Sequence, residues 1–251
     1  MKKLSIFILV STLGLTGCSS VPAKNPADPF ESFNRSMYNF NDGVDKAVAK
    51  PLAKGYNAVV PDLGKTLISN FFSNLDDVLV TMNDLLQFKF KQAFSDGMRV
   101  LVNTTVGIGG LVDVASQGEL PKHNEDLGQT LGYWGLENGP YIVWPLLGSS
   151  SLRDSLGLYG DSQVSLINKT KHIRTRNQMI VTKGINRRAQ LLEAEKVLDE
   201  ATLSDDRYQI IRDIYLANRK NQVYDGNPPR EKYENFDDDT PVSGIPATPQ
   251  P

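Results

Sequence analysis

The 251-residue sequence has one cysteine and two histidines. A single cysteine excludes an internal disulfide framework and a zinc site built from cysteines. Two histidines leave few ways to build a histidine-based metal site or acid–base catalyst. The 27 Lys and Arg nearly balance the 29 Asp and Glu, so the chain lacks the basic excess typical of nucleic-acid-binding proteins. We therefore expect an ordered protein that binds no nucleic acid, holds no cofactor or metal, and has few residues suited to catalysis.

The one long apolar run lies at the N-terminus. Two lysines precede the apolar residues 4–15, a stretch too short to span a bilayer but typical of a secretory signal peptide. It ends in Leu15-Thr16-Gly17-Cys18, the pattern of a bacterial lipobox. We predict that residues 1–17 are the signal peptide and that Cys18 is the lipid attachment point. Ser19 follows in place of the aspartate of an inner-membrane retention signal, which favours an outer-membrane anchor facing the periplasm. The alternative is an ordinary signal peptide with an incidental cysteine.

The mature chain divides into three parts. Residues 18–27 are small, polar or proline and are predicted to be a lipidated tether. Residues 28–220 contain the apolar residues of a folded domain. Residues 225–251 hold 6 of the 14 prolines and the acidic run Asp237-Asp238-Asp239, which predicts a disordered C-terminal tail.

Apolar residues recur at helical spacing through most of the domain. Asp28-Pro29-Phe30-Glu31 predicts the start of the first helix, with Asp28 as its N-cap, and Asp42-Gly43 predicts its end. Asn74 is expected to cap a second helix, which carries an apolar stripe through Leu86. Further stripes predict helices that include residues 90–102, 191–201 and 208–215. The strict alternation of apolar and polar residues that is typical of strands is nearly absent. We therefore predict an all-α fold of short amphipathic helices.

The polar residues of the predicted second helix allow two interpretations. Five of them are expected to face either a polar lumen or ordinary solvent: Asp76, Asp77, Thr81, Asn83 and Asp84.

Two glycine-rich stretches interrupt the helical pattern. Gly107, Gly109 and Gly110 lack the following Lys-Ser/Thr of a nucleotide loop and are expected to shape a turn. That turn would join two helices, or form the tip of a helical hairpin that dips into a bilayer. Glycines between residues 128 and 160 are interleaved with aromatic residues. Tyr133, Trp134, Tyr141 and Trp144 are predicted to lie at a membrane interface, with an aromatic core as the alternative.

Residues 169–188 are strongly basic. Lys169, Lys171, Arg174 and Arg176 are predicted to attract anionic lipid head groups, each contributing ~1 kcal/mol near such a surface. The alternative is a solvated helix face balanced by acidic residues elsewhere.

Several motifs together resemble the MlaA (VacJ) family of outer-membrane phospholipid-transport lipoproteins. They match that family in order and spacing over roughly residues 28–220: DPFESFNRSMYNFN (28–41), NTTVGIGGLVDVA (103–115), LGYWG (131–135), GPYIVWPLLG (139–148), LRD (152–154) and RAQLL (188–192). The resemblance implies a helical ring in the inner leaflet of the outer membrane, with an amphipathic central channel. It further implies association with a trimeric porin and transfer of phospholipids to a soluble periplasmic carrier protein, which maintains lipid asymmetry.

The first helix would link the lipid anchor to this ring. We therefore predict that Asn39, Phe40, Asn41, Asp42 and Gly43 form a hinge that sets the position of the ring.

Two other classes of function stay open. A lipid-anchored hydrolase would need a nucleophile with a base, and the candidates are Ser149–Ser151 with His123 or His172, or a carboxyl pair of Glu119 and Glu125. No nucleophile-elbow motif is present, so we expect no enzyme. A purely structural envelope lipoprotein is the third possibility. The sequence also lacks a phosphate-binding loop, so transport is expected to be passive.

Overall fold

The computed structural model describes residues 25–201 and 206–229. The predicted signal peptide, Cys18, most of the tether and most of the C-terminal tail lie outside the described residues. The elements in chain order are α2 (Glu31–Val44), the π-helical turn η1 (Asp45–Ala49), α3 (Lys50–Val59), α4 (Asp62–Leu86), α5 (Phe90–Thr105), the 3-10 turn η2 (Ser116–Gly118), α6 (Leu127–Tyr133), β1 (Tyr141–Trp144), β2 (Gly148–Ser151), α7 (Leu152–Val164), α8 (Ile173–Ala201) and α9 (Arg207–Val223).

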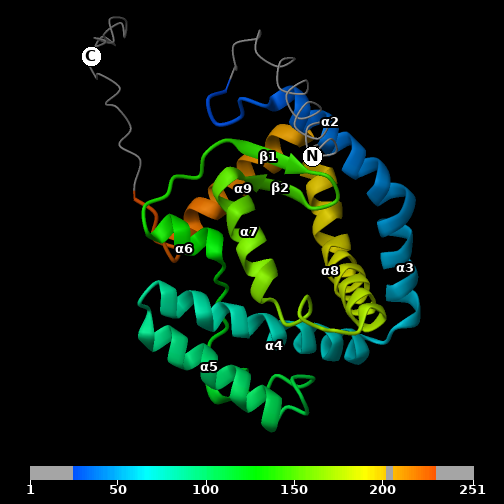
Figure 1. Cartoon of the computed structure of the whole chain (residues 1–251). Helices are drawn as coiled ribbons and strands as arrows, with labels where there is room; N and C mark the ends of the chain where they lie inside the picture. Colours follow the sequence, from blue (N-terminus) through cyan, green and yellow to red (C-terminus); the bar gives the residue numbers. More distant parts are fainter. Residues whose placement is uncertain (1–24, 202–205, 230–251) are drawn as a thin grey trace, which may run out of the picture.

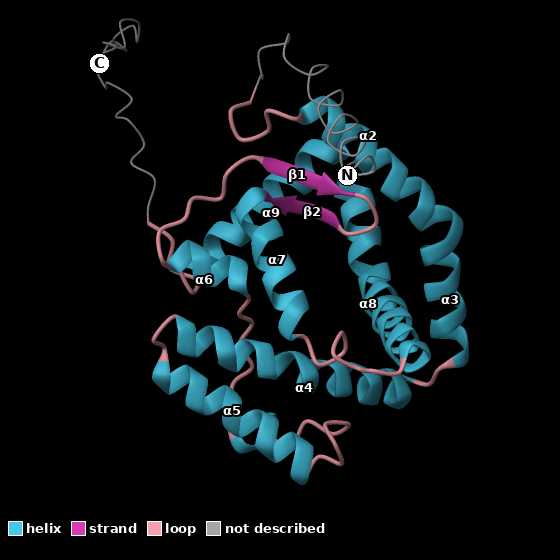
Figure 2. Cartoon of the chain, viewed as in Figure 1, coloured by secondary structure: helices cyan, strands magenta, loops and turns pink. Residues whose placement is uncertain are grey.

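The elements follow one another around a ring (Figure 1). Helices α2 and α3 form one side with α8 beside α3, and α4 crosses the far end with α5 alongside it. The hairpin of β1 and β2, helix α9 and the short helix α6 lie at the other end, and α7 extends from there toward α4. Figure 2 shows how little of the described chain is strand. The predicted all-α, ring-like fold is therefore confirmed, with one small hairpin added.

The hairpin is antiparallel and short. Its register pairs Tyr141 with Ser151 and Trp144 with Gly148. Leu146 and Gly148 have φ values of 63° and 84°, so the chain reverses through two left-handed residues. The inner side of the hairpin packs on α2 and α9 and makes the main apolar cluster of buried residues, which consists of Tyr141, Val143 and Tyr208.

The first helix differs from its predicted boundaries. It begins at Glu31, and Asp28 does not cap it. Asp28 is buried instead, and its carboxylate accepts hydrogen bonds from Asn34 Nδ2 at 2.8 Å and from the Tyr208 hydroxyl at 2.5 Å. The predicted end at Asp42-Gly43 is also wrong, because α2 continues through η1 into α3. One glycine costs a helix only about 1 kcal/mol, which neighbouring contacts readily offset.

Other helices are longer than their apolar stripes suggested. Helix α4 begins after Pro61, so Asn74 lies inside it and caps nothing. The Asn74 side chain donates to Thr104 Oγ1 on α5 at 2.9 Å, a tertiary contact that no local signal reveals. Helix α8 begins at Ile173, well before the predicted residue 191. Both forms of the prediction for the glycine turn, two helices joined by it or a helical hairpin with the turn as its tip, are wrong, because only turns and η2 lie between α5 and α6.

Candidate functional site

Helix α4 is polar on its buried side and apolar on its exposed side. Asp77, Asn83 and Asp84 are buried, whereas Met82, Leu85 and Leu86 are exposed. A helix on the surface of a water-soluble protein has the opposite arrangement. The interpretation of Asp77, Asn83 and Asp84 as solvated surface is therefore wrong, and Asp76 and Thr81 are half-buried.

Helix α5 has the same inverted arrangement, in which apolar residues are exposed and polar residues are buried. Phe90, Phe94 and Leu101 share an exposed stripe, and Phe94 is 72% exposed. The buried positions, at helical spacing on the opposite side, are the small Ala93 and the polar residues Asp96, Arg99 and Asn103. Large apolar side chains on the outside and charged ones on the inside indicate that the exterior is not designed for water alone.

Helix α7 has the same pattern. Leu152, Leu156 and Tyr159 are exposed, while Arg153 and Asp154 are buried. Three helices on different parts of the ring thus share an apolar exterior and a polar interior. Yet no helix within residues 25–201 and 206–229 combines the length and apolarity needed to cross a membrane.

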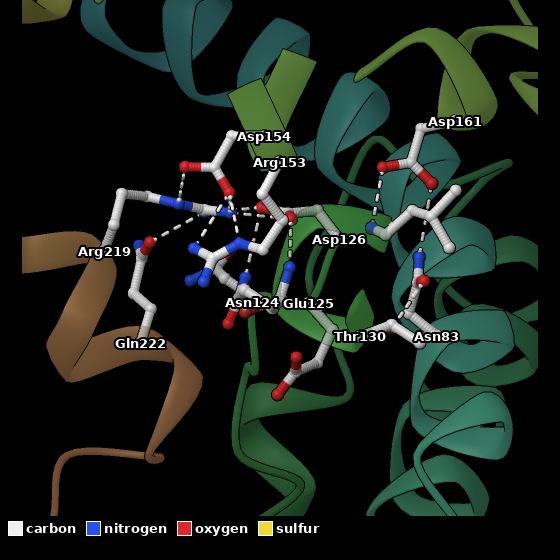
Figure 3. A network of polar contacts seen from close by, with 12 residues as sticks. Asn83, Asn124, Glu125, Asp126, Thr130, Arg153, Asp154, Asp161, Arg219 and Gln222 are labelled. Atoms are coloured by element: carbon white, nitrogen blue, oxygen red, sulfur yellow. Dashed lines mark hydrogen bonds and ion pairs between the residues drawn. The ribbon is translucent and has the colours of Figure 1, made fainter. Parts of the chain in front are cut away.

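Paired charges make the polar interior possible. Arg219 on α9 joins two acids from other elements (Figure 3). Its guanidinium donates to both oxygens of Asp126 at 2.7 and 2.9 Å and to both oxygens of Asp154 at 2.8 and 2.9 Å. Arg153 also donates to Asp154, at 3.0 and 3.1 Å. Burial alone would raise the pKa of Asp154, but hydrogen bonds from Arg219 and Tyr215 and the arginine charges hold that pKa at about 2.

A second charged group lies between α4, α5 and the segment after α5. Arg99 is buried and contacts Asp77 at 3.5 Å and Asp113 at 3.2 Å. The ammonium of Lys122 also binds Asp77. Burial lowers the pKa of Lys122 to about 8, with Asp76 opposing the shift and Lys183 adding to it. Sequence reasoning missed Arg99, Arg153 and Arg219; a signal was available for Arg99, which lies opposite the apolar stripe of residues 90–102.

An amphipathic cavity of about 370 Å³ lies between α2, the hairpin, α8 and α9. One part of its wall is apolar, with Leu191, Ala194 and Ile211, and another is charged, with Asp45 and Arg188. Arg188 binds Asp45 at 2.6 and 2.7 Å, so the charges in this wall are paired. Such a surface can contact both the polar and the apolar parts of an amphiphile.

The predicted glycine turn follows α5. Gly109 and Gly110 have φ values of 68° and 88°, which favour glycine. A Cβ on Gly107 would lie 2.1 Å from the Val112 carbonyl oxygen, so no larger residue fits there. Ile108, in the same turn, is 71% exposed and gives the turn an apolar tip.

The four predicted interface aromatics do not share one environment. Tyr133, Trp134 and Trp144 are partly exposed, but Tyr141 is only 1% exposed. The prediction for Tyr141 is corrected: its side chain lies on the inner side of β1, and its hydroxyl hydrogen-bonds Ser149 Oγ at 2.7 Å. Trp134 packs edge-on against Phe88, and its indole donates to the Leu86 carbonyl at 3.1 Å.

The predicted hinge residues lie on the second half of α2. Asn39, Phe40 and Gly43 are exposed, and Asp42 binds Lys46 at 2.7 Å. Asn41 has a specific partner, since its side chain donates to the Trp144 carbonyl at 2.9 Å and accepts from the Leu146 amide at 2.7 Å. Asn41 therefore joins α2 to the hairpin turn, a role that the sequence did not indicate.

The predicted basic residues surround the start of α8. Lys169, Lys171 and Arg174 are exposed and Arg176 is half-exposed, and none of the four forms an ion pair with another described residue. Further along α8, two basic residues are neutralised, because Lys183 binds Asp76 and Arg188 binds Asp45 and Glu195. The glycine turn, the aromatics, the hinge residues and the basic residues stand on different elements and form no single cluster.

The residues considered for catalysis are engaged elsewhere. Ser149 pairs with Tyr141, and Ser151 caps α7. His123 contacts Asp96 at 2.8 Å, and Glu125 accepts from Gln87 and Lys89. Within the described ranges, no three His, Cys, Asp or Glu residues are grouped as a metal site would require.

A family model described as MlaA lipoprotein matches residues 26–222. The chain belongs to the MlaA lipoprotein family. It is 34% identical over 220 residues to the intermembrane phospholipid transport system lipoprotein MlaA of Shigella flexneri and to that of Escherichia coli K12, covering 85% of this chain and 86% of each relative. An uncharacterised protein of Rickettsia felis is 41% identical over 127 residues, and there the match spans about half the length of each chain, 51%.

A solved structure gives the same result. It comes from work on the structural basis for maintenance of bacterial outer membrane lipid asymmetry, and it superposes with a TM-score of 0.69 at 32% identity. The match covers 80% of this chain and 99% of the solved one. The resemblance to the MlaA family predicted from the sequence motifs is confirmed.

Proposed function

We propose that this protein is an outer-membrane lipoprotein through which phospholipids leave the outer leaflet of the outer membrane and pass to a periplasmic carrier, which maintains lipid asymmetry. One observation carries the proposal: α4, α5 and α7 expose apolar residues and bury charged ones. Family membership supports the same function, because full-length relatives are named phospholipid transport lipoproteins.

The cost of moving a charged head group through hydrocarbon explains why a protein with an apolar exposed surface and buried polar residues is useful for lipid transport. Moving a charged head group through hydrocarbon without polar contacts costs many kcal/mol. A ring with an apolar exterior can lie in one leaflet, while a polar passage through the ring would offer the head group a route past the hydrocarbon. Such a route needs no chemical energy, and the carrier sets the direction if it binds lipid more tightly than the membrane does.

The protein would be held at the membrane by two features. Acyl chains on Cys18 would anchor the N-terminus, since each buried methylene contributes ~0.8 kcal/mol. The segment from Cys18 to Asp28 reaches at most ~36 Å when fully extended, which keeps the fold near the surface. Tyr133, Trp134 and Trp144 would lie at the level of the head groups. A trimeric porin is the proposed neighbour of the apolar exterior.

A transfer assay with purified components tests the function. The lipidated protein in vesicles that contain labelled phospholipid should accelerate delivery of intact lipid to the soluble carrier, compared with protein-free vesicles. Equal rates with and without the protein would exclude the transport function. Release of free fatty acid, lost on replacing Ser149–Ser151 or His123, would favour a hydrolase.

We further propose that the basic residues at the start of α8 attract anionic lipid head groups. Replacing Lys169 and Lys171 by glutamine should weaken binding to anionic vesicles about thirtyfold at low salt, since each charge contributes ~1 kcal/mol. Replacement of both by arginine is the matched control and should retain affinity. The difference between the two variants should shrink with salt and vanish on neutral vesicles; an equal affinity at low salt would reject the proposal.

The hinge prediction is also retained as a proposal. Deleting Asn39 and Phe40 would rotate the preceding part of α2 by ~200° relative to Asn41 and the elements that follow. The variant should be made and lipidated but should expose phospholipid at the cell surface, measured by lipid A palmitoylation or by labelling of surface phospholipid. Normal asymmetry in that variant would show that this segment does not set the position of the ring.

A further inference from the structure

Helices α4 and α5 meet along an antiparallel seam of polar residues, all of them buried except Thr104 at one end. The seam pairs Asn74 with Thr104 at 2.9 Å and Asp77 with Arg99 at 3.5 Å. Between these pairs and the turn that joins the helices, the same register places the carboxyl group of Asp84 on α4 beside that of Asp96 on α5. The first two pairs are complementary in charge or hydrogen bonding. The third joins two acids.

Both acids are fully enclosed. Asp84 and Asp96 are each 0% exposed. Neither oxygen of Asp84, and only one oxygen of Asp96, has a hydrogen-bond partner among the described residues when both carboxyls are ionised. The partnered oxygen of Asp96 contacts His123 Nδ1 at 2.8 Å. Buried polar atoms without partners are costly, and one proton held between the two carboxyl groups would give a partner to an oxygen of each.

The charged groups nearby do not provide partners for these carboxyl oxygens. Lys89, in the turn between the helices, binds Glu125 at 3.0 Å and Asp225 at 2.5 Å. Glu125 adds a further negative charge near Asp84. One turn away, Arg99 is engaged by Asp77 and Asp113. Two adjacent ionised carboxylates in such a site repel each other strongly, and binding one proton removes the repulsion.

We propose that Asp84 and Asp96 share one proton at neutral pH, with Asp84 as the protonated partner that donates a hydrogen bond to Asp96, and that this proton fastens α5 to α4. The proposal concerns the packing of the two helices and does not depend on the lipid pathway. Burial and the contact with Asp96 raise the pKa of Asp84 to about 8, in agreement with this arrangement. Since α5 carries Phe90, Phe94 and Leu101 on its exposed side, the position of this apolar surface would depend on the proton.

The sign of the pH dependence follows from linkage. An aspartate in the unfolded chain has a pKa of about 4. Between that value and about 8, the folded protein holds a proton that the unfolded chain has released. The unfolding equilibrium constant should therefore rise about tenfold per pH unit through this range and level off above it.

The test compares unfolding of the full-length lipidated protein in detergent at pH 5, 6, 7 and 8. In Asp84→Asn the amide can donate to Asp96 as the protonated acid does. Whatever slope other groups contribute, the unfolding equilibrium constant of this variant should rise about tenfold less per pH unit than that of the wild type. Asp154→Asn is the matched control: Asp154 is a buried carboxylate with a pKa of about 2, so its loss should destabilise the protein equally from pH 5 to 8 and leave the wild-type slope unchanged.

A spectroscopic measurement does not depend on the variant's folding well. Infrared spectra of the wild type at pH 7 should contain a protonated carboxyl band that disappears above pH 8 or on Asp84→Asn substitution. The same slope in Asp84→Asn as in the wild type, or no such band at pH 7, would overturn the proposal. So would stabilisation of the wild type by added calcium together with destabilisation by a chelator, because a metal ion would then join the carboxylates.

Discussion

Arg219 illustrates how a charged side chain is accommodated inside this protein. Its planar guanidinium binds both oxygens of Asp126 and both oxygens of Asp154, so elements far apart in sequence converge on one group. The space around it is tight, because a Cβ on Gly128 would lie 2.6 Å from Asp154 and 2.8 Å from Arg219. A glycine at that position is therefore required for the ion pairs to form.

Replacing Arg219 by glutamine should lower the free energy of unfolding by about 3 kcal/mol, because the buried carboxylate of Asp154 and the partly exposed carboxylate of Asp126 both lose this partner. Arg219→Lys keeps the positive charge but lacks the planar guanidinium that binds two carboxylates at once. This variant should therefore lose less free energy of unfolding than Arg219→Gln. Chemical denaturation at pH 7 measures both. A loss below 1 kcal/mol for the glutamine variant would show that the network is not a structural support.

The same network predicts acid sensitivity. Because the pKa of Asp154 is about 2 in the folded protein and about 4 in an unfolded chain, its contribution to stability is present above pH 4 and is lost as the pH falls toward 2. In Arg219→Gln this part of the acid dependence should be much weaker, which denaturation at pH 2, 3 and 4 would reveal. An unchanged acid dependence in the variant would contradict this role of Arg219.

At the scale of single residues, side-chain type predicted environment only in part. Tyr141 and Trp144 are both aromatic and both lie on β1, yet the alternation of the strand buries one and exposes the other. The buried role of Asp28 depends on Tyr208, which is 180 residues away. Neither fact follows from local sequence.

At the scale of elements, periodicity predicted that helices exist but not which side faces inward. The apolar stripes of α4 and α5 have the spacing of a helix that packs on a core. Spacing is the same whether the stripe meets protein or lipid, so the inversion became visible only in the folded structure. Helix ends were also mispredicted where tertiary contacts override local signals, as at Asn74 and Gly43.

Helices α6 and α7 approach closely at glycines. A Cβ on Gly157 would lie 2.3 Å from the backbone nitrogen of Gly128, so Gly157→Ala must force the two helices apart. We expect a loss of about 1–3 kcal/mol in the free energy of unfolding. Gly184 of α8 has no atom within 4 Å of its added Cβ, and Gly184→Ala should stabilise the protein by about 1 kcal/mol. Thermal unfolding of the two variants should shift in opposite directions; shifts of the same sign would refute the close approach of α6 and α7.

At the scale of the whole molecule, the described helices follow a ring, and α4, α5 and α7 expose apolar residues while burying charged ones. None of the described helices is suited to crossing a membrane alone, and further exposed apolar residues lie on α2, α3, α8 and α9. The proposed function therefore requires that the outside of the ring is in contact with lipid.

Spin labels on the lipidated protein in vesicles test that statement most directly. Cys18 is the only native cysteine and is acylated in this account, so a label reacts only with an introduced cysteine. A label replacing Phe94 on the apolar exterior should be relaxed by oxygen, which concentrates in hydrocarbon, and not by a water-soluble nickel complex. A label replacing Lys169 should show the reverse. Equal access of the nickel complex to both positions would contradict the lipid-facing ring.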